Sequence, residues 1–421
     1  MKTFRSIKGT YDLLPDDLKV WQRVGSQIHK IMQQYGYGEI RTPAFENTEL
    51  FIRGIGTETD IVNKEMYSWV DQGGNALTLK PELTAPVVRA YLQHQLGNQN
   101  PIHRLYYFDS LFRRERPQKG RQRQFYQFGA EAIGSPNPEQ DAEIIAMAYR
   151  IYQSFDIQEM EVRLNSIGSP EIRPEYLELL RNTLNKYRGE LCKTCETRLG
   201  KNALRIFDCK NPGCQKVLDE KAPCIFDSIS ADDHRHFDSI TQTLTKMNIP
   251  FNHDNKLVRG LDYYSHTTFE ISSSALGAQD ALCGGGRYND LIEQLGGTPT
   301  PAVGFAAGME RLMLVLEKME HLESSPDVYF ITMGENAVVQ ACRIAQDLRK
   351  ECGITVILET LRRSMKSQMR DANRYGTKMV IILGEEELQK NIAVVKDMAT
   401  SNQLEVPISN IVNYFNNMPE K

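Results

Sequence analysis

Residues 257–270 read LVRGLDYYSHTTFE, a stretch in which a glycine and a cation precede aromatic and β-branched residues. We expect a loop that leads into a strand over residues 263–271, because such residues favour strands. Gly260 lets the backbone approach a ligand or a neighbouring strand closely, and Arg259 beside it is a permanent cation. The stretch predicts either a pocket wall that faces an anionic ligand or a core strand whose arginine pairs with a carboxylate.

Length and composition restrict the class of protein. The 421 residues suggest two or three domains at about 150 residues per domain. The chain is 41% hydrophobic and 25% charged, as in soluble globular proteins, and no apolar run approaches the roughly 18 residues of a membrane span. The first ten residues do not form a secretory signal, so we expect a cytoplasmic protein. The net charge of −4 argues against a general polyanion binder, and we expect neither DNA nor a membrane as a partner.

Two strands, predicted at 104–113 and 124–133, enclose a basic loop at 115–123. Arginine forks in this segment could hold phosphates, although a solvated charged loop is the alternative. On the second strand, Gln127 and Glu131 lie four residues apart and therefore face the same side. The sequence thus places a charged loop and two polar side chains on one hairpin.

Other segments predict further walls of such a pocket. A hairpin is expected from 67–70 and 76–79, followed by PELTAP at 81–86, which opens a helix to about residue 95. Thr84 is either a simple N-cap or, with Glu82, an acceptor for a ligand ammonium group. A strand over 282–286 ends in three glycines, but no GxGxxG pattern with a downstream acid is present, which excludes a dinucleotide-binding fold.

The remaining chain predicts a helix along residues 21–35, a strand over 39–46 that contains Pro43, and a helical insertion at about 169–248. Within this insertion, two cysteine pairs have a spacing loosely suited to four thiolates on zinc, with free thiols as the alternative: Cys192 and Cys195, Cys209 and Cys214. A polar linker over 317–326 precedes strands at 328–333, 355–358 and 379–383 with helices between them, which predicts an α/β domain with a largely parallel sheet.

The stretch at 257–270 resembles the first of two signature sequences of histidyl-tRNA synthetases, and LCGGGRYND at 282–290 resembles the second. The similarity covers nearly the whole chain and includes KGTYDLLP at 8–15 and PAVGFAAGMER at 301–311. It implies an α+β fold: a class II catalytic domain at 1–320, built on an antiparallel sheet with the helical insertion, and an α/β anticodon-binding domain at 326–421. The family does not require a metal in the insertion, so we expect free thiols and no metal site.

The resemblance also implies a histidine–tRNA ligase that activates L-histidine with ATP and Mg²⁺ and transfers it to the 3′ end of tRNA(His), as a homodimer. The catalytic residues would be Arg113 and Arg259, on either side of the α-phosphate. Histidine would be bound by Glu82, Thr84, Gln127, Glu131, Tyr263, Tyr264 and Tyr288. ATP would be bound by Arg113, Glu115, Arg121, Phe125 and Arg311. Gln118 would contact the tRNA acceptor end.

Two alternatives remain distinct from this prediction. A synthetase-like regulatory subunit of histidine biosynthesis would be expected to lack the phosphate-binding arginines, the second signature or the C-terminal domain, all of which are present here. A class II synthetase for another amino acid would not be expected to carry both histidine-specific signatures.

Overall fold

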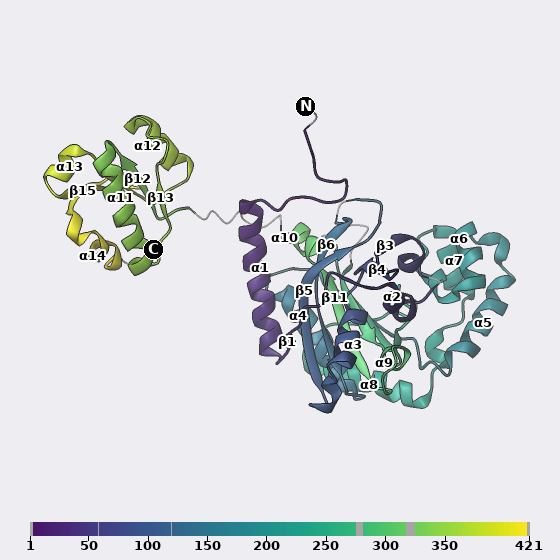
Figure 1. Ribbon diagram of the computed structural model, residues 1–421. Helices are drawn as coiled ribbons and strands as arrows, with labels where there is room; N and C mark the ends of the chain where they lie inside the picture. Colours follow the sequence, from purple (N-terminus) through teal and green to yellow (C-terminus); the bar gives the residue numbers. More distant parts are fainter. Residues whose placement is uncertain (1–2, 58, 119, 275–280, 317–324, 419–421) are drawn as a thin grey trace. The chain divides into compact units, whose positions relative to one another are not determined.

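The computed structural model describes residues 3–57, 59–118, 120–274, 281–316 and 325–418 (Figure 1). The chain divides into two compact units, residues 1–320 and 321–421. Most of the linker predicted at 317–326 lies outside the described residues. Within the described ranges, no helix has both the length and the apolar character needed to cross a bilayer.

The first unit is built on an eight-stranded sheet. The six inner strands of this sheet all pair antiparallel with one another. Short parallel strands close its two edges. The spatial order is β1 (Gly38–Glu39), β5 (His103–Phe112), β6 (Gln124–Ile133), β11 (Ala302–Gly308), β10 (Ala281–Arg287), β9 (Ser265–Ser273), β7 (Met160–Ser166) and β8 (Asn252–His253). This sheet confirms the predicted fold class, and β6 begins and ends where the sequence predicts.

One face of this sheet packs on the main hydrophobic core. Helices α1 (Pro15–Gln34), α4 (Pro138–Gln153) and α8 (Ala231–Lys246) contribute buried residues to it. Along β6, Phe128 and Ala130 belong to this core, so Gln127 and Glu131 point to the opposite face. That second face carries α3 (Thr84–Gln93) and the short α9 (Leu291–Gln294), and the cavity described below lies on it.

A small three-stranded sheet stands beside the large one. β3 (Tyr67–Val70) and β4 (Ala76–Leu79) form the predicted hairpin, with Tyr67 opposite Leu79. β4 also pairs with β2 (Phe45–Asn47), which precedes α2 (Thr48–Ile55) and η1 (Ile61–Glu65). The single strand predicted at 39–46 is therefore wrong, because β1 and β2 belong to different sheets. Pro43 lies in the connection between them, where no ladder hydrogen bond is needed.

The insertion is helical, as predicted, and forms a lobe of the first unit (Figure 1). It has its own buried residues, including Leu180, Leu184, Leu199 and Ile206. Its elements before α8 are α5 (Arg173–Asn185), η3 (Arg188–Glu190), α6 (Lys193–Lys201), η4 (Ala203–Asp208), α7 (Pro212–Lys221) and η5 (Ile225–Ser228). Two more elements complete the unit, η2 (Leu96–Asn98) and α10 (Met309–Leu316).

The second unit is an α/β domain with a five-stranded sheet in the order β13 (Val356–Leu358), β12 (Val328–Thr332), β14 (Met379–Leu383), β15 (Ile392–Asp397) and β16 (Gln403–Pro407). The first three strands are parallel, as expected, whereas β15 and β16, which were not predicted, extend the sheet antiparallel. The helical elements are α11 (Glu335–Asp347), η7 (Leu348–Cys352), α12 (Met365–Arg374), α13 (Glu385–Gln389), η8 (Ile408–Asn410) and α14 (Ile411–Asn416).

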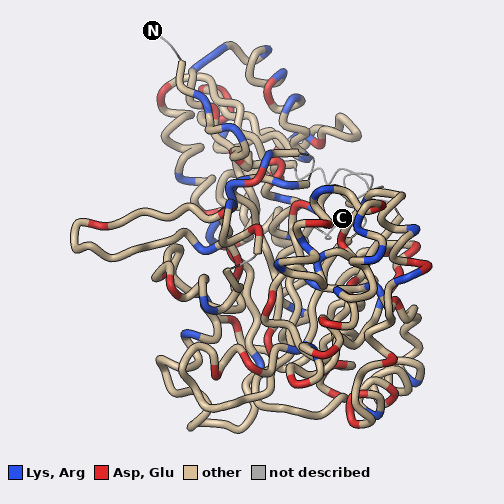
Figure 2. The backbone as a smooth tube through the Cα atoms, turned by 90° about the vertical axis from the view of Figure 1, so that its right-hand side faces the viewer, with Lys and Arg blue, Asp and Glu red and all other residues tan. Residues whose placement is uncertain are grey.

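Basic side chains of the second unit lie next to acids. Arg363 pairs with Glu359 and Asp371, and Arg374 pairs with Asp371. Figure 2 shows Lys and Arg interspersed with Asp and Glu along the described backbone. Part of the cationic charge around α12 is therefore neutralised locally.

Candidate active site

A cavity of about 460 Å³ opens on the second face of the large sheet. The three arginines predicted to handle ATP, Arg113, Arg259 and Arg311, all line it. They come from the end of β5, from the loop before β9 and from the start of α10, which lie far apart in the sequence. Other predicted site residues line the same cavity: Glu82, Thr84, Glu115, Arg121, Phe125, Gln127, Tyr263 and Tyr264.

Beneath one wall lies Glu131, which is only 1% exposed. Its Oε1 accepts hydrogen bonds from Thr84 Oγ1 at 2.9 Å and from the Tyr107 hydroxyl at 3.1 Å. Its Oε2 accepts one from the Tyr288 hydroxyl at 2.6 Å. Burial raises the pKa of Glu131 to about 8, and the hydrogen bonds from Tyr288 and Thr84 oppose that rise. The described residues that line the cavity do not include Glu131 and Tyr288. Glu131 is connected to the lining by its hydrogen bond from Thr84, and Tyr288 by its ring contact with Tyr263.

Glu82 caps the start of α3. Its Oε2 accepts the backbone N–H of Thr84 at 2.7 Å and its Oε1 accepts that of Ala85 at 2.9 Å. These are first-turn N–H groups that have no partner within a helix. The possibility that Thr84 is merely the N-cap is thus ruled out, since Glu82 satisfies these groups and the Thr84 hydroxyl points to Glu131. Burial raises the pKa of Glu82, so one carboxyl group in the cavity wall and a second one behind it, that of Glu131, resist ionisation.

Tyr263 and Tyr264 precede β9, which begins at Ser265, so the strand predicted from residue 263 starts two residues late. In a regular strand adjacent side chains point to opposite faces. Because these two lie in the preceding turn, both reach the cavity, with ring centroids 4.7 Å apart. The Tyr263 hydroxyl donates to Thr84 Oγ1 at 3.3 Å, which connects this turn to the Glu131 network.

Arg259 is held by Glu270, a residue that the sequence analysis did not single out. Arg259 Nη1 donates to Glu270 Oε2 at 3.1 Å, and its Cζ lies 5.8 Å from the Tyr264 ring centroid. Arg259 therefore pairs with a carboxylate, as one alternative expected, but from a loop and not from a core strand. It also lines the cavity, and that it faces an anionic ligand stays a prediction. Glu270 stands opposite Gly284 in the β9–β10 ladder, and this glycine leaves the room that the guanidinium occupies.

We expect Gly284→Ala to lower the rate of catalysis at this cavity about tenfold with little loss of folding stability. The added Cβ would overlap the Arg259 guanidinium, which is the far end of a flexible side chain and can be pushed aside. A misplaced group costs catalysis far more than it costs folding. Steady-state kinetics and thermal unfolding of the variant test this. The matched control is Gly200→Ala, where a Cβ meets nothing within 4 Å; equal rates in both variants would contradict the prediction.

The basic loop contributes an ordered group around Arg113. Arg113 Nε donates to the carbonyl of Pro81 at 2.8 Å, and its Cζ lies 5.2 Å from the Phe125 ring centroid. Glu115 accepts from Arg121 Nη1 at 3.1 Å and lies 3.8 Å from Arg113 Nη1. Gln118 exchanges backbone hydrogen bonds with Arg121 and is not among the described residues that line the cavity. The loop thus presents two guanidiniums and an aromatic ring to the cavity.

Further lining residues come from α10 and from the insertion. Arg311 Nη1 donates to the carbonyl of Ala281 at 2.6 Å. Beside it, Glu310 accepts the backbone N–H of Tyr126 at 3.0 Å, and burial raises its pKa to about 7. From the insertion, Arg205 Nη1 donates to the carbonyl of Gly260 at 2.9 Å. No local sequence pattern marked Glu310 or Arg205, because only the tertiary fold brings them to the cavity.

Comparison with known proteins identifies the family. The family described as histidyl-tRNA synthetase matches residues 9–312, and the anticodon-binding domain matches residues 327–418. The chain belongs to the histidyl-tRNA synthetase family. A histidine–tRNA ligase of Dehalococcoides mccartyi is 45% identical over 97% of this chain and 98% of its own length. One of Geobacillus thermodenitrificans is 45% identical over 98% and 97%.

Solved structures of the histidyl-tRNA synthetase family agree with the fold. The apo S. aureus histidyl-tRNA synthetase is 37% identical, with a TM-score of 0.82 over 98% of this chain and 100% of that one. A Bacillus halodurans structure described as an ATP phosphoribosyltransferase regulatory subunit/histidyl-tRNA synthetase is 22% identical, with a TM-score of 0.65 over 91% of this chain and 99% of that one. At that identity the likeness shows the fold alone.

Proposed function

We propose that this cavity performs both steps of the histidine–tRNA ligase reaction, the activity that family membership assigns to the chain. In the first step a histidine carboxylate oxygen attacks the α-phosphorus of ATP, and the bond to pyrophosphate breaks. In the second, a terminal ribose hydroxyl of tRNA(His) attacks the acyl carbon, and AMP leaves. The observation that carries the proposal is the convergence of Arg113, Arg259 and Arg311 on one cavity backed by the Glu131 network.

Catalysis would rest on positioning and on charge stabilisation, since the reaction needs no protein nucleophile. Arg113 and Arg259 would lie on either side of the α-phosphate, where negative charge grows in the transition state. Their placement supports this, because Pro81 and Glu270 hold the two guanidiniums before any substrate binds. Such preorganised donors do not have to reorient during the reaction.

Histidine would bind at the end of the cavity formed by Thr84, Gln127 and the tyrosine pair. Its ammonium group would be held by Glu82 and Thr84, and its imidazole by Glu131 and Tyr264, with Tyr263 and Tyr288 as supports. Thr84 lies between Glu131 and the cavity. Glu131 would therefore contact the imidazole either after the Thr84 side chain rotates away or indirectly, through the Thr84 hydroxyl. A site built on buried polar groups rejects ligands that leave those groups unpaired.

ATP would occupy the arginine-lined end, with adenine on Phe125 and the distal phosphates near Arg121, Glu115 and Arg311. Mg²⁺ fits this end, because it prefers carboxylate oxygens together with substrate phosphates, and Glu115 and Glu310 line the cavity. When bound, the ion would neutralise charge on the β- and γ-phosphates.

The other partners follow from the domain assignment. We propose that residues 1–320 form the catalytic domain, with Gln118 in the loop that meets the tRNA acceptor end, and that residues 326–421 bind the anticodon. Homodimer formation and cytoplasmic localisation stay predictions. The match of residues 327–418 to an anticodon-binding domain supports the second assignment.

Amino-acid-dependent ATP–pyrophosphate exchange tests the function. With the purified chain and each standard amino acid in turn, we expect exchange with L-histidine at least about 100-fold above that with any other, as for sites that recognise a substrate by hydrogen bonds. Dominant exchange with another amino acid would contradict the histidine assignment. No exchange with any of them, together with histidine binding, would favour the regulatory-subunit alternative.

A further inference from the structure

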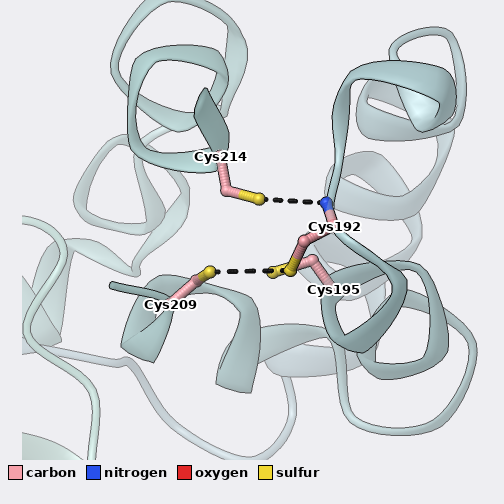
Figure 3. Close-up of side chains that lie close together, drawn as sticks. All are labelled: Cys192, Cys195, Cys209 and Cys214. Atoms are coloured by element: carbon pink, nitrogen blue, oxygen red, sulfur yellow. Dashed lines mark hydrogen bonds between the residues drawn. The ribbon is translucent and has the colours of Figure 1, made fainter. Parts of the chain in front are cut away.

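Four cysteines of the insertion meet at one point (Figure 3). The sulfur atoms of Cys192, Cys195, Cys209 and Cys214 all lie within 4.8 Å of one another, and three of the four residues are buried. They come from separate elements: Cys192 precedes α6, Cys195 lies in the first turn of α6, Cys209 follows η4, and Cys214 lies in the first turn of α7. The fold therefore gathers two sequence pairs into one cluster.

The spacing of these sulfurs is that of ligands around one ion. A tetrahedral zinc with Zn–S bonds of about 2.3 Å holds its sulfurs about 3.8 Å apart. Cys192 Sγ and Cys209 Sγ are 3.9 Å apart. A disulfide requires an S–S distance of about 2.05 Å, and all four cysteines are free thiols in this structure. A cubane iron–sulfur cluster places its thiolates on four separate irons and needs a wider cage.

Backbone groups around the cluster favour thiolates. The N–H of Cys192 donates to Cys214 Sγ at 3.1 Å, and the N–H of Asn211 donates to Cys209 Sγ at 3.4 Å. Cys195 and Cys214 also lie in the first turns of α6 and α7, where the positive end of each helix dipole favours a negative charge. Hydrogen bonds of this kind orient metal ligands and offset their negative charge.

We propose that Cys192, Cys195, Cys209 and Cys214 bind one Zn²⁺ as a closed tetrathiolate site. The geometry thus favours the alternative that the sequence analysis set aside when it expected free thiols. Four protein ligands fill the tetrahedron, so the ion is structural and takes no substrate. Each thiol releases its proton when the ion binds, and the site therefore loses zinc as pH falls.

The site also fixes a part of the cavity wall. Cys209 directly follows η4, and Arg205 of η4 donates to the carbonyl of Gly260. Asn202, the residue before η4, donates from Nδ2 to Asp262 Oδ1 at 2.8 Å. An ion that ties α6 and α7 to the end of η4 would hold this connection in place. The effect of zinc on the cavity wall rests on the proposed function. The presence of zinc in the cysteine cluster does not.

The test is to purify the full-length protein without chelator and to measure its zinc content per chain by elemental mass spectrometry. Wild type and the control Cys224→Ser should each retain one zinc per chain, because Cys224 lies in the same lobe outside the cluster. Cys209→Ser and Cys214→Ser should lose most of it. Reconstitution of the reduced, metal-free wild type with Co²⁺ should give the thiolate charge-transfer and visible bands of a tetrahedral site, which both variants should lack.

Three results would overturn the proposal. The first is a zinc content of wild type no higher than background, which does not rise when zinc is added to the reduced protein. The second is an intact mass that is lower by two hydrogen atoms per disulfide under non-reducing conditions, with free thiols that appear only after a reductant is added. The third is equal zinc in wild type and in both cluster variants, which would place the ion elsewhere. Unchanged amino-acid activation by the zinc-free protein would contradict only the effect of zinc on the cavity wall.

Discussion

Arg259→Ala will slow formation of histidyl-adenylate by about 100- to 1000-fold, the usual effect of removing one preorganised donor from a site of developing charge. The guanidinium is held by Glu270 at 3.1 Å and lines the cavity, so in the proposed mechanism its loss removes a fixed cation from the reacting phosphate. Histidine affinity should change little, because the contacts proposed for the imidazole and the ammonium group involve other residues. Single-turnover adenylate formation and equilibrium histidine binding separate the two quantities.

The matched control is Arg163→Ala. Arg163 Nη2 donates to the other oxygen of Glu270 at 2.8 Å but is not among the described residues that line the cavity. We expect its adenylation rate to stay within a few-fold of wild type. An equal loss in both variants would assign the effect to the Glu270 ion pairs, and pyrophosphate exchange near the wild-type rate in Arg259→Ala would contradict a catalytic role.

Glu131→Gln will reduce histidine activation by about 10- to 100-fold, mainly through a higher KM for histidine. The two oxygens of the Glu131 carboxyl group are hydrogen-bonded to three hydroxyls, those of Thr84, Tyr107 and Tyr288. Glutamine keeps one acceptor oxygen and replaces the other with an NH2 donor. At least one of these hydroxyls therefore loses its acceptor, and a buried hydroxyl without an acceptor costs about 1–3 kcal/mol. Histidine kinetics of the variant check this, and an unchanged KM would show that Glu131 has no part in recognition.

The same variant tests the raised pKa of Glu131. The folded state keeps this carboxyl proton up to about pH 8, whereas the unfolded chain releases it near the ordinary value of 4.5. Its contribution to stability is therefore complete below about pH 4.5 and is lost as pH rises through about 8, with a slope of at most about 1.4 kcal/mol per pH unit.

Urea unfolding of wild type and Glu131→Gln across this range measures that contribution. Burial also raises the pKa of Glu82 and Glu310, so both proteins lose stability with rising pH. The difference between them isolates Glu131, and wild type should show the steeper loss. Parallel pH profiles would contradict a carboxyl group that stays protonated in the folded protein.

Local patterns predicted the framework of the site well. The bounds of β6 and the β3–β4 hairpin follow from alternation and turn residues, which act over a few neighbours. Spacing on β6 predicted that Gln127 and Glu131 share one face, and the structure shows that this face lies opposite the core. The arginines were found because the family signatures mark them, and the fold then brings all three to one cavity.

What the sequence could not predict depends on contacts between distant segments. Glu270 reads as an ordinary strand residue until β9 is placed beside β10, where it stands opposite Gly284 and holds Arg259. Arg205 lies in a helical insertion, and no local pattern tells that it reaches Gly260. The four cysteines show the same limit, because their spacing allowed both free thiols and a metal site and only the packing of α6, η4 and α7 brings them together.

The most direct measurement is a crystal structure with L-histidine and an ATP analogue that cannot release pyrophosphate. We predict the α-phosphorus between the guanidiniums of Arg113 and Arg259, with the imidazole directed toward Glu131 and Tyr264. A nucleotide bound outside this cavity, or an α-phosphate that contacts neither arginine while histidine occupies the site, would contradict the account.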